Sequence, residues 1–381
     1  MPVNNIQIRP VETKADLKAF IRMTKGHYKT DPNWVQPLTF LKLEDLNPKK
    51  NPFFDNAEVQ LWLAENNNII VGRISAQIDK LAQEKWGPNL GYFGLFEADN
   101  EATAHALLKT AAGWLKTRGM KTIQGPWSLS PKEECGMLTN GFDAPPCFLM
   151  PHGKPDYQDW VISYGLAKAH DLIAYQLDLM KGFPEKMKRI VKAAERNKRT
   201  VLREMDMKDY DRDISYIIDI VSDAWVDNWG FTPFTQDEGK HLATSLKLIL
   251  KPHRTVICEY DGEPVAFMVT IPDLNDDIKD FGGSLFPFNV FKFLSRRILT
   301  KKEGRMRVPL MGVKQAFQKR PIGAAMAMWM IDYSTNQVME RGAYWGELGW
   351  ILDENEGMRS ILVDIGCEEY KTYGIFEKAI N

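Results

Sequence analysis

Hydrophobic and polar positions follow the same succession of patterns in both halves of the chain. The first half predicts a strand, a helix, a two-stranded hairpin, another strand and a helix, at residues 6–10, 14–27, 59–64 with 69–74, 91–96 and 102–117. The second half predicts the same order at residues 201–204, 214–225, 255–260 with 265–269, 307–313 and 322–340. Each half closes with a short helix, a glycine and a last strand, at 160–164, Gly165 and 172–175, and at 358–363, Gly366 and 373–376. This repetition indicates a tandem duplication.

The duplicated pattern predicts an α/β fold with mixed sheets, in which two tandem domains each place helices around a central mixed β-sheet. We expect the N-terminal domain at residues 1–180 and the C-terminal domain at 200–381, because 381 residues suit two domains of middling size. Residues 181–199 between them are rich in lysine and arginine and are predicted to form a helical linker.

Composition and charge narrow the class of protein. The chain is 44% hydrophobic with a formal net charge of -1, which argues against binding to nucleic acid. Its start has no apolar signal core and no run reaches the roughly 18 apolar residues of a membrane-spanning helix, so we expect a cytoplasmic protein. The histidines and cysteines lack metal-ligand spacing, so no metal is expected. The cysteines are predicted to be reduced thiols, at Cys135, Cys147, Cys258 and Cys367.

One turn carries candidate chemistry. The strand that ends at Val313 leads through Gln318-Lys319-Arg320 into Pro321-Ile322-Gly323-Ala324-Ala325, at the start of the next helix. Small residues there leave the first backbone N–H groups open to an anion, and Lys319 and Arg320 add positive charge. Pro321 costs little at a first helical turn, where its missing N–H would have had no partner. The alternative is an ordinary helix start that binds nothing.

The order of elements and this turn resemble the GNAT superfamily of acyl-CoA N-acyltransferases, whose pyrophosphate loop has the form Arg/Gln-x-x-Gly-x-Gly/Ala. The resemblance implies that the C-terminal domain binds acyl-CoA as co-substrate through Gln318, Lys319, Arg320, Gly323, Ala324 and Ala325. It also implies that the backbone of Met311, Gly312 and Val313 polarises the thioester carbonyl. The matching region of the first half, residues 99–104, has neither a glycine nor a basic residue. We therefore expect a degenerate N-terminal domain without a CoA loop.

Short motifs along nearly the whole chain are similar to one bacterial family of double-GNAT proteins, whose relatives include the bacterial ceramide synthases. The motifs are Asn51-Pro52-Phe53-Phe54, Gly72-Arg73-Ile74, Gly125-Pro126-Trp127-Ser128, Gly141-Phe142-Asp143-Ala144-Pro145-Pro146, Asn228-Trp229-Gly230-Phe231-Thr232-Pro233 and Pro272-Asp273-Leu274-Asn275. Those synthases acylate the amine of a long-chain sphingoid base with acyl-CoA. The resemblance implies an acyl-CoA-dependent N-acyltransferase that acts on an amine, with a long-chain lipid amine as one candidate acceptor.

The groups that would move protons are less well defined. The tyrosine on the last helix that often protonates the thiolate in GNAT enzymes is replaced by Leu362, which leaves Tyr344, Cys367 or water as substitutes. Glu347, on the predicted strand at 343–348, is the candidate base, and the alternative is a carboxylate on an exposed strand face or paired with a lysine. Asp273 is a further catalytic candidate where a strand opens into a loop, unless it forms an Asx turn.

Four residues are candidates for binding the acceptor: Asn228, Trp229, Asn275 and Glu134. Trp229 follows a predicted helix end and either walls the acceptor pocket or fills the core. Asn275 shares the loop of Asp273, and Glu134 lies in a polar loop of the first half that either reaches the other domain or stays on the surface.

A long insertion precedes the predicted strand at 307–313. Residues 284–302 contain four phenylalanines followed by a basic end, which is typical of a segment at a membrane interface or over a long acyl chain. The alternative is a helix packed on its own domain. The insertion predicts a peripheral contact with the inner membrane.

Two functions outside this reading stay open. One is a ligand-binding or regulatory protein on an inactive GNAT scaffold, which the loss of the tyrosine at Leu362 would fit. The other is a peptidoglycan-type transferase, also a double GNAT, that uses aminoacyl-tRNA. The near-neutral charge and the intact turn weigh against it.

Overall fold

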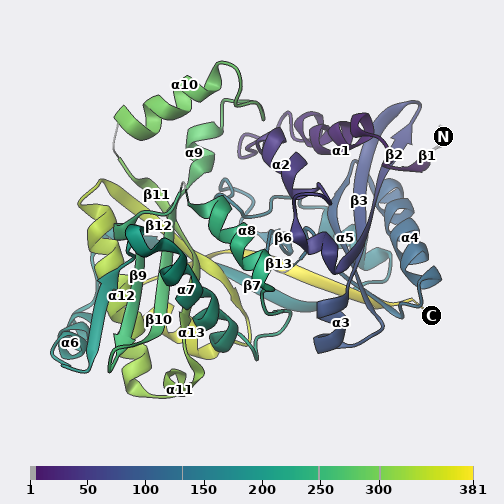
Figure 1. The fold of residues 1–381 in the computed structure, drawn as a ribbon. Helices are drawn as coiled ribbons and strands as arrows, with labels where there is room; N and C mark the ends of the chain where they lie inside the picture. Colours follow the sequence, from purple (N-terminus) through teal and green to yellow (C-terminus); the bar gives the residue numbers. More distant parts are fainter. Residues whose placement is uncertain (1–5, 131, 248, 300–301, 381) are drawn as a thin grey trace. The chain divides into compact units, whose positions relative to one another are not determined.

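The computed structural model describes residues 6–130, 132–247, 249–299 and 302–380 (Figure 1). The chain forms two compact units, each drawn from several segments. Unit 1 comprises Met1–Leu172, Asp277–Phe293 and Lys371–Asn381, and unit 2 comprises Ile173–Asp276 and Leu294–Tyr370. Each unit is a mixed β-sheet flanked by helices, which confirms the predicted fold class. The predicted domain division at residues 180 and 200 stays a prediction.

The sheet of unit 1 follows the predicted order of elements. Its strands are β1 (Ile6–Pro10), β2 (Ala57–Asn66), β3 (Ile69–Asp79), β4 (Leu90–Ala98), β5 (Thr122–Gly125), β6 (Met137–Asn140) and β13 (Glu368–Ala379). Neighbouring strands run antiparallel from β1 to β4, whereas β4 and β5 are parallel. The helices are α1 (Lys14–His27), α2 (Thr39–Asp45), α3 (Lys80–Trp86), α4 (Glu101–Thr117) and α5 (Tyr157–Ser163). The apolar face of α4 packs on β3 and β4 and forms the core of the unit.

Unit 2 repeats this arrangement. Its strands are β7 (Ala167–Asp178), β8 (Thr200–Glu204), β9 (Thr255–Tyr260), β10 (Glu263–Pro272), β11 (Gly304–Val313) and β12 (Ala343–Leu352). The pair β11 and β12 is parallel, as β4 and β5 are in unit 1. The helices are α6 (Glu185–Glu195), α7 (Tyr210–Ala224), α8 (Gln236–Leu246), α11 (Gln315–Gln318), α12 (Pro321–Met339) and α13 (Glu356–Asp364). Short helices α9 (Leu274–Ile278) and α10 (Asn289–Leu294) lie in the connection from β10 to β11.

The last strand of each sequence half completes the sheet of the other unit. Residues 173–178 of β7, which closes the first half, belong to unit 2 and neighbour β12 there. The strand that closes the second half, β13, pairs with β5 in unit 1, where Phe376 lies opposite Gly125. The hydrophobic pattern predicted both strands, but it could not predict this exchange because periodicity carries no information about pairing partners.

An ion cluster recurs at the same place in both units. An arginine of the first strand binds an aspartate in the first turn of the next helix and a glutamate of the second strand. The two sets are Arg9, Asp16 and Glu65, and Arg203, Asp213 and Glu259. The four nitrogen–oxygen distances lie between 2.6 and 2.7 Å. Equivalent side chains in equivalent elements are what a tandem duplication would leave.

Within the described part of the chain, no helix is both long and apolar enough to cross a membrane. All four cysteines are buried free thiols.

Candidate functional site

The start of α12 presents backbone N–H groups next to positive charge. Its first residue is Pro321, and the preceding Arg320 is extended and provides no side-chain cap. A Cβ at Gly323 would lie 2.2 Å from the carbonyl oxygen of Phe317, so only glycine allows α11 to pack against this turn. The Gly323 N–H donates to the carbonyl oxygen of Arg320 within the turn. The positive end of the helix dipole still lies beside the exposed side chains of Lys319 and Arg320. This arrangement suits an anion such as a pyrophosphate.

Side chains around the turn fix its position against the end of α7. The side-chain amide of Gln318 donates to the carbonyl oxygens of Val313 and Ala224, both at 2.9 Å. The backbone N–H of Gln315 donates to Asp223 at 2.7 Å. In the structure, Gln318 therefore holds the loop in place, and Lys319 and Arg320 supply its charge.

The strands β11 and β12 separate just before this turn. Their parallel register ends at Val308 opposite Leu348, whereas the register between β11 and β10 continues to Val313. The predicted residues Met311, Gly312 and Val313 therefore pair with β10 only. The opening between the two strands lies close to the start of α12 in the sequence, where a thioester could meet the β11 backbone.

The end of α7 covers one side of this part of β11. The indole N–H of Trp225 donates to the carbonyl oxygen of Met311 at 3.2 Å. A Cβ at Gly312 would lie 2.9 Å from the Phe267 ring and 3.3 Å from Ala224, so a side chain there would displace the helix. Trp225 is a site residue that the sequence analysis missed, four positions before the predicted Trp229.

A charged network lies on one face of β11 and β12. Because side chains alternate along strands and Arg307 lies opposite Glu347 in the register, both project to the same face. Glu347 is fully buried, and its Oε1 lies 3.0 Å from Arg307 Nε in an ion pair whose angle is not that of a hydrogen bond. The hydroxyl of Tyr370 donates to its other oxygen. The guanidinium of Arg307 also donates to the carbonyl of Gly349 at 3.2 Å.

The network extends along the same face to Asp273. The guanidinium of Arg305 lies 4.1 Å from the ring centre of Trp345, which in turn contacts the Tyr370 ring edge to face at 5.7 Å. Arg305 Nε lies 3.5 Å from the buried carboxylate of Asp273. That carboxylate also accepts the N–H of Asn275 at 3.2 Å, which is the Asx turn considered as the alternative for Asp273. Asp273 is thus joined to Glu347 through a chain of contacts.

Leu362, which replaces the usual acid, and the two side chains considered as its substitutes lie elsewhere. Leu362 is buried in the core of unit 2, so the usual tyrosine position is filled by packing. Tyr344 is half exposed and, by strand alternation, faces away from Glu347. Cys367 is buried, and burial raises the pKa of its thiol to about 12. Tyr370 was not predicted, because nothing in the local sequence pattern links it to Glu347, 23 positions earlier.

The other predicted acceptor residues, Asn228, Trp229 and Glu134, are described by contacts of their own. Asn228 and Trp229 are partly buried in the loop after α7, where the Asn228 N–H bonds the carbonyl of Trp225 at 2.9 Å. Glu134 belongs to unit 1 and pairs with Lys42 at 2.8 Å. Their roles stay predictions.

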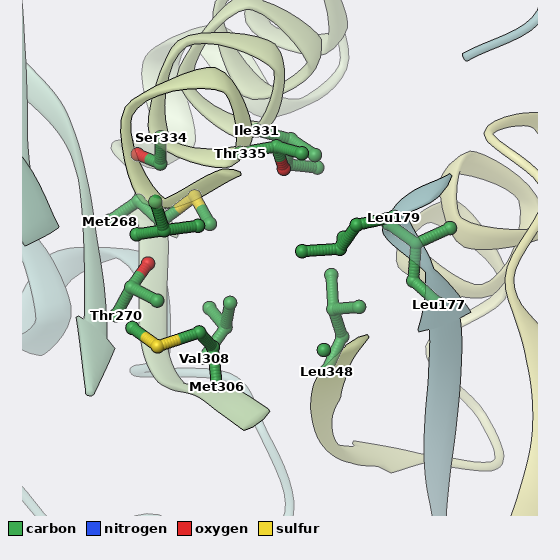
Figure 2. A pocket seen from close by; sticks show the side chains of 12 residues that line it. Leu177, Leu179, Met268, Thr270, Met306, Val308, Ile331, Ser334, Thr335 and Leu348 are labelled. Carbon is green, nitrogen blue, oxygen red and sulfur yellow. The ribbon is translucent and has the colours of Figure 1, made fainter. Parts of the chain in front are cut away.

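An apolar cavity of about 30 Å³ lies on the opposite face of β11 and β12 (Figure 2). Its lining comes from β7, β10, β11, β12 and α12 and consists of Leu177, Leu179, Met268, Thr270, Met306, Val308, Ile331, Ser334, Thr335, Val338, Gly346 and Leu348. Val308 and Leu348 are the last paired residues before β11 and β12 separate. The cavity therefore adjoins the opening. The hydroxyls of Thr270 and Ser334 are buried and have no hydrogen-bond partner among the described residues.

No family model matches the chain. It is 41% identical over 378 residues to a protein of Caulobacter vibrioides named bacterial ceramide synthase, covering 99% of this chain and 98% of the relative. It is 38% identical over 377 residues to Protein YghO of Escherichia coli, covering 98% of this chain and 95% of that protein.

Two solved structures share the fold at low identity. A tandem GNAT protein from the clavulanic acid biosynthesis pathway superposes with a TM-score of 0.59 at 10% identity, over 99% of both chains. A GCN5-related N-acetyltransferase from Sphaerobacter thermophilus superposes with a TM-score of 0.57 at 12% identity, over 100% of this chain and 97% of its own. The tandem GNAT fold thus extends over the whole chain.

Proposed function

This chain belongs to the tandem GNAT family that includes the relative named bacterial ceramide synthase, and from that membership we propose that it transfers an acyl group from acyl-CoA to the amine of a long-chain lipid. The observation that carries the proposal is the opening between β11 and β12. It has a basic, uncapped helix start on one side and, on the other, the buried Glu347, one position before the last pair of the two strands.

Unit 2 supplies the contacts for the donor. The start of α12 with Lys319 and Arg320 would hold the pyrophosphate, and the β11 backbone from Met311 to Val313 would receive the pantetheine arm. When bound, acyl-CoA supplies a thioester carbon that an amine can attack. The apolar cavity beside the opening would take part of the acyl chain, because eight of its twelve lining residues are aliphatic or methionine.

Glu347 and Tyr370 can manage the protons of this reaction. Glu347 accepts a proton from the attacking amine, which leaves nitrogen free to form the amide bond. The Tyr370 hydroxyl gives its proton to the departing thiolate sulfur and recovers one from Glu347 through their hydrogen bond. Arg307 orients Glu347 and keeps the buried carboxylate paired. Tyr370 thereby takes the role that Leu362 cannot fill.

The proposal is tested in two stages with the full chain. Calorimetry with CoA and long-chain acyl-CoA measures donor binding, and mass spectrometry then follows amide formation on sphingoid bases and on short amines. We expect donor binding and a preference for long-chain amines. Binding without turnover would assign the chain to a ligand-binding role, and absence of donor binding would overturn the proposal.

A further inference from the structure

Three phenylalanine side chains are exposed within six residues of unit 1. Phe286, Phe288 and Phe291 are 64%, 77% and 69% exposed. The ring of Phe40 in α2, itself 38% exposed, meets Phe286 edge to face at 6.2 Å. We call these four side chains the phenylalanine patch. Large aromatic side chains gathered on a surface mark a contact with another molecule or with a membrane.

The fold holds this patch outward. Neighbouring residues Leu285 and Phe293 pack against a small core of unit 1, formed by Val35, Leu38, Ile278 and Phe281. The carbonyl of Gly283 accepts the backbone N–H of Thr39 at 2.9 Å, which joins the segment to the start of α2. The Asn289 side chain donates to the carbonyl of Ser284 at 2.7 Å. The segment is therefore anchored on its inner side, and its exposed rings belong to an ordered surface.

The segment that carries the patch is basic in sequence, which favours an anionic partner. Residues 284–302 contain five basic residues and no acidic residue: Lys292, Arg296, Arg297, Lys301 and Lys302. Lys292, on the same short helix as Phe291, is 57% exposed and lies 3.6 Å from Asp280. Aromatic rings beside lysine and arginine are the composition of segments that rest at the surface of an anionic bilayer.

We propose that the phenylalanine patch inserts into the interfacial region of a bilayer that contains anionic lipid. The exposed fractions of the four side chains together amount to about two and a half whole side chains. At roughly 150–250 Å² for each whole side chain, the patch offers about 500 Å² of apolar contact. A specific protein interface needs about 800 Å² per partner. Binding to a bilayer requires no such minimum contact area, because each inserted ring contributes to the binding free energy by itself. The inference rests on the patch alone and does not require the proposed acyl transfer.

The test is co-sedimentation of the full chain with vesicles of phosphatidylethanolamine and phosphatidylglycerol, and with vesicles of phosphatidylcholine only. The variant Phe286→Ser/Phe288→Ser/Phe291→Ser is compared with a matched control, Ile69→Ser/Met180→Ser, whose residues are 67% and 71% exposed elsewhere. We expect the triple variant to lower the partition coefficient for anionic vesicles at least about tenfold, because three apolar side chains are lost. The control should bind like the unsubstituted chain, and phosphatidylcholine vesicles should bind less.

Several results would overturn the proposal. One is failure of the unsubstituted chain to sediment with anionic vesicles, and a second is binding of the triple variant to these vesicles as strong as that of the control. A third is that the unsubstituted chain forms a concentration-dependent dimer and does not bind vesicles, while the triple variant stays monomeric. That result would make the patch a contact between two copies of the chain. Thermal unfolding of the triple variant checks that its fold is retained. Turnover of a short soluble amine should be the same in all three proteins. This measurement distinguishes a failure of the proposed acyl transfer from a failure of membrane binding.

Discussion

The helix that follows the fourth strand of the repeat begins differently in the two units. In unit 1, α4 is capped by the side chain of Asn100, which accepts the N–H of Thr103, and its first residue is Glu101. In unit 2, α12 follows Arg320, has no side-chain cap and starts beside Lys319. A capped, acidic start satisfies its own N–H groups and repels phosphate, whereas an uncapped, basic start attracts it. One copy of the duplicated helix has a side-chain cap, and the other copy begins without one.

The strands beside these helices differ in the same sense. In unit 1, the chain turns after β5 so that the backbone N–H of Trp127 donates to the carbonyl oxygen of Phe93 at 2.8 Å. The side-chain amide of Gln77 donates to the carbonyl oxygen of Trp127, also at 2.8 Å. A Cβ at Gly94 would lie 1.5 Å from the Trp127 carbonyl oxygen, so the space along β4 is filled by the chain itself. In unit 2, β11 beyond Val308 pairs with β10 only. Among the described residues, the chain after β5 thus fills the space along β4 in unit 1, whereas in unit 2 the pairing of β11 with β12 ends at Val308.

The comparison is tested most strongly at Glu347. We expect Glu347→Gln to lower kcat about 100- to 10,000-fold, because an amide cannot accept the proton of the amine. Tyr370→Phe should lower kcat as well and displace the alkaline side of the pH profile, while donor binding is kept. As a control in unit 1, Gln124→Ala on β5 should leave the rate unchanged. A Glu347→Gln rate close to that of the unsubstituted chain would refute the assignment.

The repeated ion cluster predicts unequal losses of stability. Burial opposes the charge of Asp213, but hydrogen bonds from Arg203 and from the Asp206 N–H hold its pKa below the ordinary value. Asp213→Asn should lower the free energy of unfolding by about 3 kcal/mol at neutral pH, since a buried charge pair is broken. Asp16→Asn should cost much less, because Asp16 and Arg9 are partly exposed. Denaturant unfolding of both variants measures the difference.

The same pair has a pH signature. A carboxylate with a lowered folded-state pKa stabilises the fold above its unfolded pKa of about 3.9, and this contribution is lost as the pH falls through the folded value. The difference in the free energy of unfolding between Asp213→Asn and the unsubstituted chain should therefore become smaller at acid pH. A gap that stays constant down to acid pH would contradict the ion-pair explanation.

The two helix starts predict opposite responses in binding and stability. Lys319→Ala/Arg320→Ala should weaken acyl-CoA binding at least about tenfold by calorimetry, because two charges beside the pyrophosphate are lost. Asn100→Ala should leave this affinity unchanged but lower the stability of unit 1 by about 1 kcal/mol, as loss of a helix cap does. Equal affinity in the double variant would show that the open start of α12 is not the donor site.

The smallest expected effect concerns donor length. A Cβ at Gly346 would meet only Leu179, at 3.8 Å, so Gly346→Val would extend into the cavity. We expect the ratio of kcat/KM for long over short acyl-CoA to fall about tenfold, which corresponds to one or two displaced methylenes. An unchanged ratio would place the acyl chain elsewhere.

The sequence predicted the repeated strands and helices where apolar spacing is regular, as in α4 and α7. It also located the turn at Arg320, since helix starts have local signatures. It did not predict α2, α3, β5, β6 or α8. It missed Arg307 and Tyr370 as partners of Glu347, because these residues are 40 and 23 positions away and only the sheet brings them together. Leu362 could be recognised as a departure from the family pattern, but the sequence could not identify a residue that takes the role of the missing tyrosine.

The exchange of last strands has a consequence for synthesis of the chain. Gln124 of β5 bonds Glu377 of β13, 253 residues later. At the 5–20 residues per second of translation, the edge of β5 would wait on the order of tens of seconds for its partner. During that time an unpaired strand edge is exposed to other nascent chains. This protein should therefore depend on chaperones while it is being made, even if the finished fold is stable.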